Sequence, residues 1–247
     1  MITLSRNEIE ALCQKAARGA GLSCGIAEEV VFSIGWLESK GIAGASELLA
    51  LLDIGSGPSW GLRGPTIASE GWLAPTSQPI CPILCGAAIS DFAQRTEADC
   101  DKTSLRLPPM FRPILMLPFV AGLAASRGIN IRMVCGDIVM AEVDHSGAVV
   151  SVSSAFPDVS SVTISGGEGL DPRNETKRDL LPMPPENYAA LNRYALKTTV
   201  PASEASRAGA GAGGQPHAVT RLHRIGLVAL QRIDLAAHSS DIHSSSR

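Results

Sequence analysis

Aromatic residues are scarce in this chain of 247 residues, where Phe, Trp and Tyr together make up 4%. A folded core must therefore come mainly from Leu, Ile, Val and Ala, and the hydrophobic content of 45% is sufficient for one. The chain also lacks a cationic surplus, because its formal net charge is −3. Binding to nucleic acid depends on clustered Lys and Arg, so we expect no nucleic-acid partner.

Long apolar runs are missing as well. The longest candidate for a membrane span, residues 113–126, is interrupted by Pro118 and falls short of the roughly 20 residues that span a bilayer, so it predicts a buried helix. Residues 1–21 carry charges throughout, unlike a secretory signal. We therefore expect a soluble cytoplasmic protein with no membrane partner.

The cysteines do not form a metal-binding pattern. Cys81 and Cys85 are the only close pair, and no second pair of ligands follows at similar spacing. In a cytoplasmic protein we expect reduced thiols that pack as small apolar groups, and no metal site.

Amphipathic helices are indicated at the N-terminus. Ser5 and Glu8 have the spacing of a capping box, and apolar residues then recur at helical intervals. Two further helices are predicted over Ile26–Ser39 and Ala45–Asp53. We interpret residues 1–54 as a helical N-terminal unit.

The middle of the chain indicates a mixture of helix and sheet. After an irregular connection, an apolar helix is predicted from Cys81, and residues 129–165 alternate as strands with a turn at 144–147. A final helix is predicted near 185–197. The fold class is α+β, in which residues 55–213 form a mixed helix and largely antiparallel sheet region.

The composition changes near residue 214. The segment 214–247 holds four of the five histidines and ends in a serine-rich stretch. We expect an atypical tail, either disordered or frame-shifted. Gly209, Gly211 and Gly214 have dinucleotide-loop spacing, but no strand leads directly into them and Pro216 follows, so a domain end is the better interpretation.

A serine-hydrolase motif is matched at residues 57–61, with Ser59 at its centre. The nucleophile elbow needs a strand before the serine and a helix after it, whereas here a leucine-rich helix precedes it. Asp144 and His145 are adjacent in a turn and cannot form a relay with each other. A plain loop is favoured.

Two arginines lie in the least polar part of the chain. Arg106 and Arg112 flank an apolar stretch, where a guanidinium needs an anionic or carbonyl partner. A structural ion pair is the favoured interpretation, and an anion-binding anchor for a small ligand is the alternative. In that alternative, the candidate ligand-binding residues are Arg106, Arg112, Ser203, Glu204 and Arg207.

Residues 4–52, from "LSRNEIEALC" to "ASELLALL", resemble the helical N-terminus of the malate/L-lactate dehydrogenase family, which binds NAD(P) without a Rossmann fold. That family carries an RG-x-x-SHG segment with a catalytic histidine. The matching stretch here is "KGIAGAS", with Ala45 in place of the histidine, and the nearest histidine along the chain is His145. The resemblance implies a relative that has lost this chemistry.

A broader resemblance rests on "CPILCGAAISD", "LRLPPMFRPILMLPFVA" and "TTVPASEASRAGAGAG". These segments are similar to an uncharacterised bacterial family, domain of unknown function number 3726, over most of residues 1–213. That family implies no reaction and no cofactor.

Two functional hypotheses follow. The first is a non-catalytic protein that binds a small ligand or serves as an accessory to an oxidoreductase system, with its N-terminal helices forming a homodimer or holding a partner. The second is an NAD(P)-linked oxidoreductase related to the malate/L-lactate dehydrogenases, with a replaced catalytic site. The cofactor stays open in both.

Overall fold

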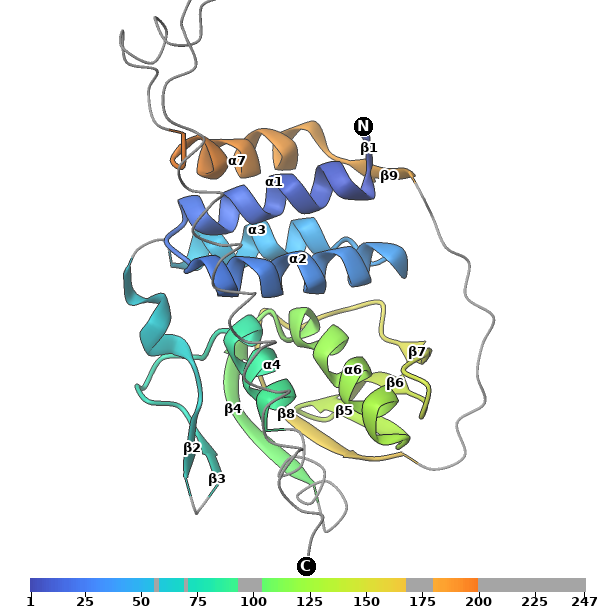
Figure 1. Cartoon of the computed structure of the whole chain (residues 1–247). Helices are drawn as coiled ribbons and strands as arrows, with labels where there is room; N and C mark the ends of the chain where they lie inside the picture. The colour runs from blue at the N-terminus through green and yellow to red at the C-terminus, as the bar shows by residue number, and fades with distance from the viewer. Residues whose placement is uncertain (56–57, 69–70, 93–103, 168–179, 200–247) are drawn as a thin grey trace, which may run out of the picture. The chain divides into compact units, whose positions relative to one another are not determined.

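Helices from distant parts of the sequence form one layer (Figure 1). They are α1 (Arg6–Gly19), α2 (Cys24–Ser39), α3 (Gly44–Ile54) and α7 (Pro185–Leu196). Helix α7 packs against α1 and α3. The computed structural model describes residues 1–55, 58–68, 71–92, 104–167 and 180–199, which lie in one compact unit.

The predicted capping box begins α1. The Glu8 N–H donates to Ser5 Oγ at 3.4 Å, and the Ser5 N–H donates to the Glu8 carboxylate at 2.8 Å. Just before it, β1 (Ile2–Ser5) pairs antiparallel with β9 (Leu180–Met183). This pairing brings α7 back to α1, and nothing in the local sequence pattern indicated it.

A sheet of five antiparallel strands lies beside the helical layer, in the order β4-β8-β5-β6-β7. The strands are β4 (Leu105–Phe111), β5 (Ile131–Cys135), β6 (Ile138–Val143), β7 (Val149–Val152) and β8 (Val159–Gly166). The α+β class is therefore correct. The predicted turn at 144–147 joins β6 to β7.

Two further helices pack on each other and on α2. They are α4 (Pro82–Asp91) and α6 (Leu117–Arg127), the latter preceded by the 3-10 turn η2 (Pro113–Met116). α6 also contacts β5 and β6. The segment expected to be irregular contains a 3-10 helix, η1 (Pro58–Arg63), and a hairpin of β2 (Thr66–Ala68) and β3 (Gly71–Leu73).

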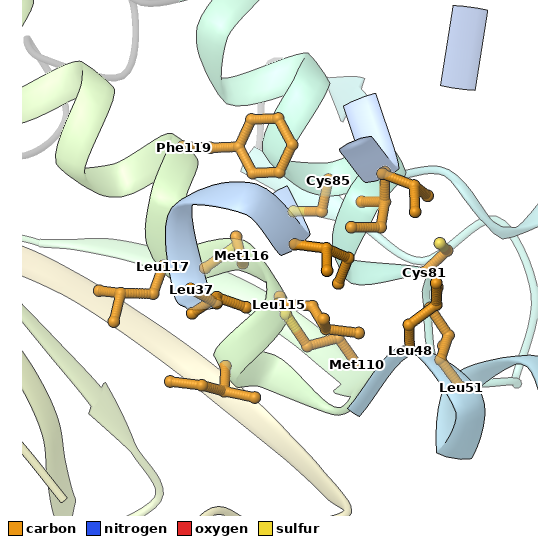
Figure 2. Close-up of a cluster of buried hydrophobic side chains, with 14 of the residues drawn as sticks. Leu37, Leu48, Leu51, Cys81, Cys85, Met110, Leu115, Met116, Leu117 and Phe119 are labelled. Carbon is orange, nitrogen blue, oxygen red and sulfur yellow. The ribbon is translucent and has the colours of Figure 1, made fainter. Parts of the chain in front are cut away.

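The core joins the helical layer to α4, η2 and β4. Figure 2 shows its centre, where side chains from α2, α3, α4, β4, η2 and α6 meet. Cys81 and Cys85 are both fully buried there, in the packing role expected of them. One buried polar contact crosses the core, because Ser33 Oγ donates to the Leu115 carbonyl at 2.8 Å.

The expected domain boundaries at 54/55 and 213/214 stay predictions. The tail 214–247 and the glycine motif at 209–214 lie outside the described residues. Among the helices described, none combines the length and the apolar character needed to cross a bilayer.

Candidate functional site

A shallow groove of about 290 Å³ lies open to solvent between α1 and α2. Its walls offer two carboxylates and two carboxamides beside two small apolar groups, and no lining residue is cationic. The lining residues, which we call the acidic groove, are Asn7, Glu10, Ala11, Gln14, Glu28 and Val31.

The form of the groove depends on a glycine in α2. Gly35 is buried, and the Glu10 carboxylate lies directly over it, because a Cβ at Gly35 would overlap Glu10 Oε1. A larger residue there would push the Glu10 side chain outward. The position of this carboxylate therefore follows from the close approach of α1 to α2.

The first turns of α2 carry uncompensated negative charge. Burial raises the pKa of Glu29, and the neighbouring carboxylates of Asp91 and Glu28 raise it further. Within the described ranges, no ion pair neutralises Glu10, Glu28 or Glu29. A positive group placed here would relieve this repulsion.

An exposed aromatic ring adjoins the acidic groove. Phe32 lies one helical turn after the lining residue Glu28, on the same side of α2, and remains 45% exposed. Its ring packs edge-on against Phe119 of α6, with centroids 5.2 Å apart and planes at 64°. The buried ring of Phe119 holds Phe32 in place, so the groove lies next to a fixed apolar surface.

Arg112 is held by carboxylates, as its favoured interpretation predicted. Its Nε donates to Glu47 Oε2 at 2.7 Å, and its Nη1 pairs with the carboxylate of Asp158. The residue has a left-handed backbone with φ of 43°, and its N–H donates to the Asp158 carbonyl at 2.8 Å. This network joins α3, the β4–η2 corner and the segment before β8.

Arg106 lies apart from Arg112. It is exposed on β4, where its backbone pairs with Thr163 of β8. The other candidate ligand-binding residues, Ser203, Glu204 and Arg207, lie outside the described residues. The anion-binding role of all five stays a prediction.

The described residues of the hydrolase motif, 58–61, lie in a 3-10 helix, and the Asp144–His145 pair lies in a turn. Residues 58–63 form η1, and the described element before it is the helix α3. Asp144 is buried, and its Oδ1 accepts hydrogen bonds from the Ser146 N–H, the Ser146 hydroxyl and the Ala148 N–H at 2.6–3.0 Å. Burial opposes ionisation, but these hydrogen bonds outweigh it and hold the pKa of Asp144 below its usual value. Asp144 therefore shapes the turn.

Ala45, at the position where the dehydrogenase resemblance expects histidine, is 3% exposed. Its N–H donates to Glu38 Oε1 at 3.0 Å. The position is thus a packed helix start, with little room for a larger side chain.

The groove residues were not among the sequence candidates. Asn7, Glu10, Ala11 and Gln14 recur at helical spacing opposite the apolar face of α1, which is also the pattern of an ordinary solvated face. The sequence held one weak signal for the groove. Gly35 lies inside the predicted helix Ile26–Ser39, where no turn is expected, and a glycine in such a place can mark close packing.

The comparisons with known proteins support one of the two resemblances. Residues 4–79 match the model of the family described as "Protein of unknown function (DUF3726)", so this part of the chain is similar to that family. The match ends well before residue 213, and the dehydrogenase resemblance has no corresponding match. No curated protein and no solved structure matches the chain.

Proposed function

We propose that the chain is a non-catalytic cytoplasmic accessory protein that holds a cationic, amphipathic segment of a partner protein in the acidic groove. The observation that carries the proposal is the polar lining, which consists of carboxylates and carboxamides without a cation. Carboxylates hold ammonium and guanidinium groups through charge-assisted hydrogen bonds.

The neighbouring apolar surface favours a peptide segment over a small ion. Val31 lines the groove and Phe32 stands exposed beside it, so a bound segment would place lysine or arginine over Glu10 and Glu28 and an apolar side chain on Phe32. Helix-binding surfaces combine such apolar anchors with complementary charge.

A heterologous partner is favoured over a homodimer at this face. In a two-fold dimer the same patch lies on both sides of the interface. The carboxylates of Glu10, Glu28 and Glu29 would then face the carboxylates of the same patch on the second copy, and like charges brought together oppose association.

Two features support the non-catalytic and cytoplasmic parts of the proposal. Ala45 supplies no proton-transfer group where the dehydrogenase resemblance expects histidine. The five cysteines in the described ranges are free thiols, as is usual in a reducing compartment.

The test uses the full chain and a synthetic helical peptide of lysine and leucine, labelled for fluorescence anisotropy. The E10Q/E28Q variant should weaken binding about tenfold or more, as expected when two charge-assisted contacts are lost. The matched control is D137N/E186Q, which removes the same charge from exposed positions on other elements. A glutamate–leucine peptide should not bind.

Equal affinity of both double variants would overturn the groove as the binding surface. A turnover screen with 2-hydroxy acids and NAD(P) addresses the alternative, an NAD(P)-linked oxidoreductase with a replaced catalytic site. Steady nicotinamide reduction would contradict the non-catalytic proposal.

A further inference from the structure

We propose that the face of the five-stranded sheet that carries Arg106 and Arg132 binds a small oxyanion, a phosphate or a carboxylate group, between these two side chains. The site is separate from the acidic groove and opposite in charge. It is formed by three adjacent strands, β4, β8 and β5, with β8 in the middle.

The strand registers place the two arginines on one face of the sheet. Arg106 on β4 lies opposite Thr163 of β8, and Arg132 on β5 lies opposite Ser165 of the same strand. Thr163 and Ser165 are two residues apart and therefore point to the same side. Their neighbours Val162 and Ile164 are fully buried on the helix-covered side.

The middle strand presents hydroxyl groups along this face. Ser161, Thr163 and Ser165 alternate with the buried residues of β8, and in the described part of the chain their hydroxyls make no hydrogen bond. Hydroxyls in such a row can donate to the oxygens of an anion.

The two arginines differ in what already neutralises them. Arg132 donates to Glu142 through Nε at 2.9 Å and pairs with it through Nη2 at 2.8 Å, so its Nη1 edge points away from that pair. Arg106 is exposed and has no ion pair with any described residue. The net charge of the site is thus positive and is centred on Arg106.

The spacing suits a single small group. Neighbouring strands lie about 4.8 Å apart, so β4 and β5 are separated by about 10 Å across β8. Arg132 is held toward Glu142 of β6 and is offset from Arg106 by two residues along β8, so Arg106 must lean inward over Thr163 and Ser165 for both guanidinium groups to hold one anion. Val134, the β5 neighbour of Thr163, adds an apolar contact for the organic part of the ligand.

The experiment titrates the ¹⁵N-labelled full chain with inorganic phosphate and, separately, with acetate at equal ionic strength. Chemical-shift changes should saturate and centre on Arg106, Thr163 and Ser165. The R106Q variant should weaken binding about tenfold, and T163V should weaken it several-fold, as expected for charged and neutral donors respectively. R18Q, which removes an exposed arginine from α1, should bind as the parent does.

Each outcome bears on the proposal. Saturation by phosphate alone supports a phosphate-bearing ligand, and saturation by acetate as well supports carboxylates too. Linear, non-saturating shifts with both probes would overturn the site, as would equal affinity of R106Q and R18Q. Thermal unfolding of each variant checks that the fold is intact, which is expected because Arg106 is exposed.

Discussion

The carboxylate of Glu38, near the end of α2, accepts a hydrogen bond from the Ala45 N–H in the first turn of α3, at 3.0 Å. Helix α3 has no side-chain cap from its own N-cap residue, Ala43. A residue of the preceding helix therefore supplies the acceptor that the helix start needs. Since Glu38 is only 7% exposed, the cap also buries a titratable group within the corner between α2 and α3.

The burial of Glu38 predicts an unusual pH dependence of stability. Desolvation raises its pKa above the ordinary 4.5, although the amides of Ala45 and Gly44 partly oppose this shift. The folded state therefore keeps this proton at pH values where the unfolded chain has lost it. The retained proton therefore stabilises the folded state fully below pH 4.5, and this stabilisation is lost as the pH rises through the pKa of Glu38 in the folded state.

The E38Q variant tests the direction of this pH dependence. Glutamine keeps an oxygen for the Ala45 N–H but cannot ionise, so the stability of E38Q relative to the parent should rise with pH from about 4 to 8. Urea unfolding at several pH values measures the difference. A pH-independent difference would contradict the raised pKa. E38A removes the acceptor as well and should cost about 0.5–2 kcal/mol.

The ion pair of Arg112 with Glu47 should contribute more to stability than its pair with Asp158. The Glu47 side chain is 14% exposed and that of Asp158 is 82% exposed, so solvent screens the second pair strongly. A double-mutant cycle with R112M and E47Q should give a coupling free energy of about 1–3 kcal/mol. The matched cycle with R112M and D158N should give under about 1 kcal/mol. Equal couplings would contradict the argument from burial.

Introducing a histidine at position 45 should destabilise the protein. Ala45 is buried against the Glu38 cap, so an imidazole would overpack the start of α3 at a cost of about 1–3 kcal/mol. The A45H variant should therefore unfold earlier in urea and gain no reduction of NAD(P) by 2-hydroxy acids. The exposed A11H variant provides the control for adding an imidazole. Turnover by A45H would count against the non-catalytic proposal.

The sequence predicted the elements whose stability depends on residues close together in the chain. The capping box at Ser5 and Glu8, the helical periodicity of α1 to α3 and the alternation of β5 and β6 were all readable, because each depends on neighbours within a few residues. The β1–β9 pairing was not readable, because it joins Ile2 to Met183 and each strand has only four residues. Short strands of this kind take their stability from tertiary partners.

The candidate sites were harder to predict for the same reason. The sequence indicated that Arg112 needs an anionic partner, but Glu47 lies 65 positions away, so only the fold could identify it. The acidic groove likewise depends on Glu10 lying over Gly35 of another helix. Arg106 is exposed on β4 rather than enclosed in apolar surroundings, and its position relative to Thr163 and Arg132 follows from strand register, which the sequence did not indicate.

The thiols should differ sharply in reactivity. Burial raises the pKa of Cys81 to about 11 and that of Cys135 to about 11, whereas Cys24 is exposed at the start of α2. Since the thiolate is the reacting form, N-ethylmaleimide should modify Cys24 of the native protein well before Cys81, Cys85 or Cys135. Peptide mass mapping measures the order, and denaturant should abolish it. Equal rates at Cys24 and Cys85 in the native state would contradict the burial of Cys85.

Two glycine-to-alanine substitutions should have opposite effects on stability. A Cβ at Gly86 of α4 would overlap the ring of Phe119, whereas a Cβ at Gly122 of α6 would meet no atom within 4 Å. Alanine favours a helix over glycine by up to about 1 kcal/mol, so G122A should stabilise the protein by about 0.5–1 kcal/mol. G86A gains the same propensity but overpacks the α4–α6 contact by about 1–3 kcal/mol, and should be destabilising overall. Urea unfolding of both variants measures this difference, and a stabilising G86A would show that α4 and α6 are not in close contact there.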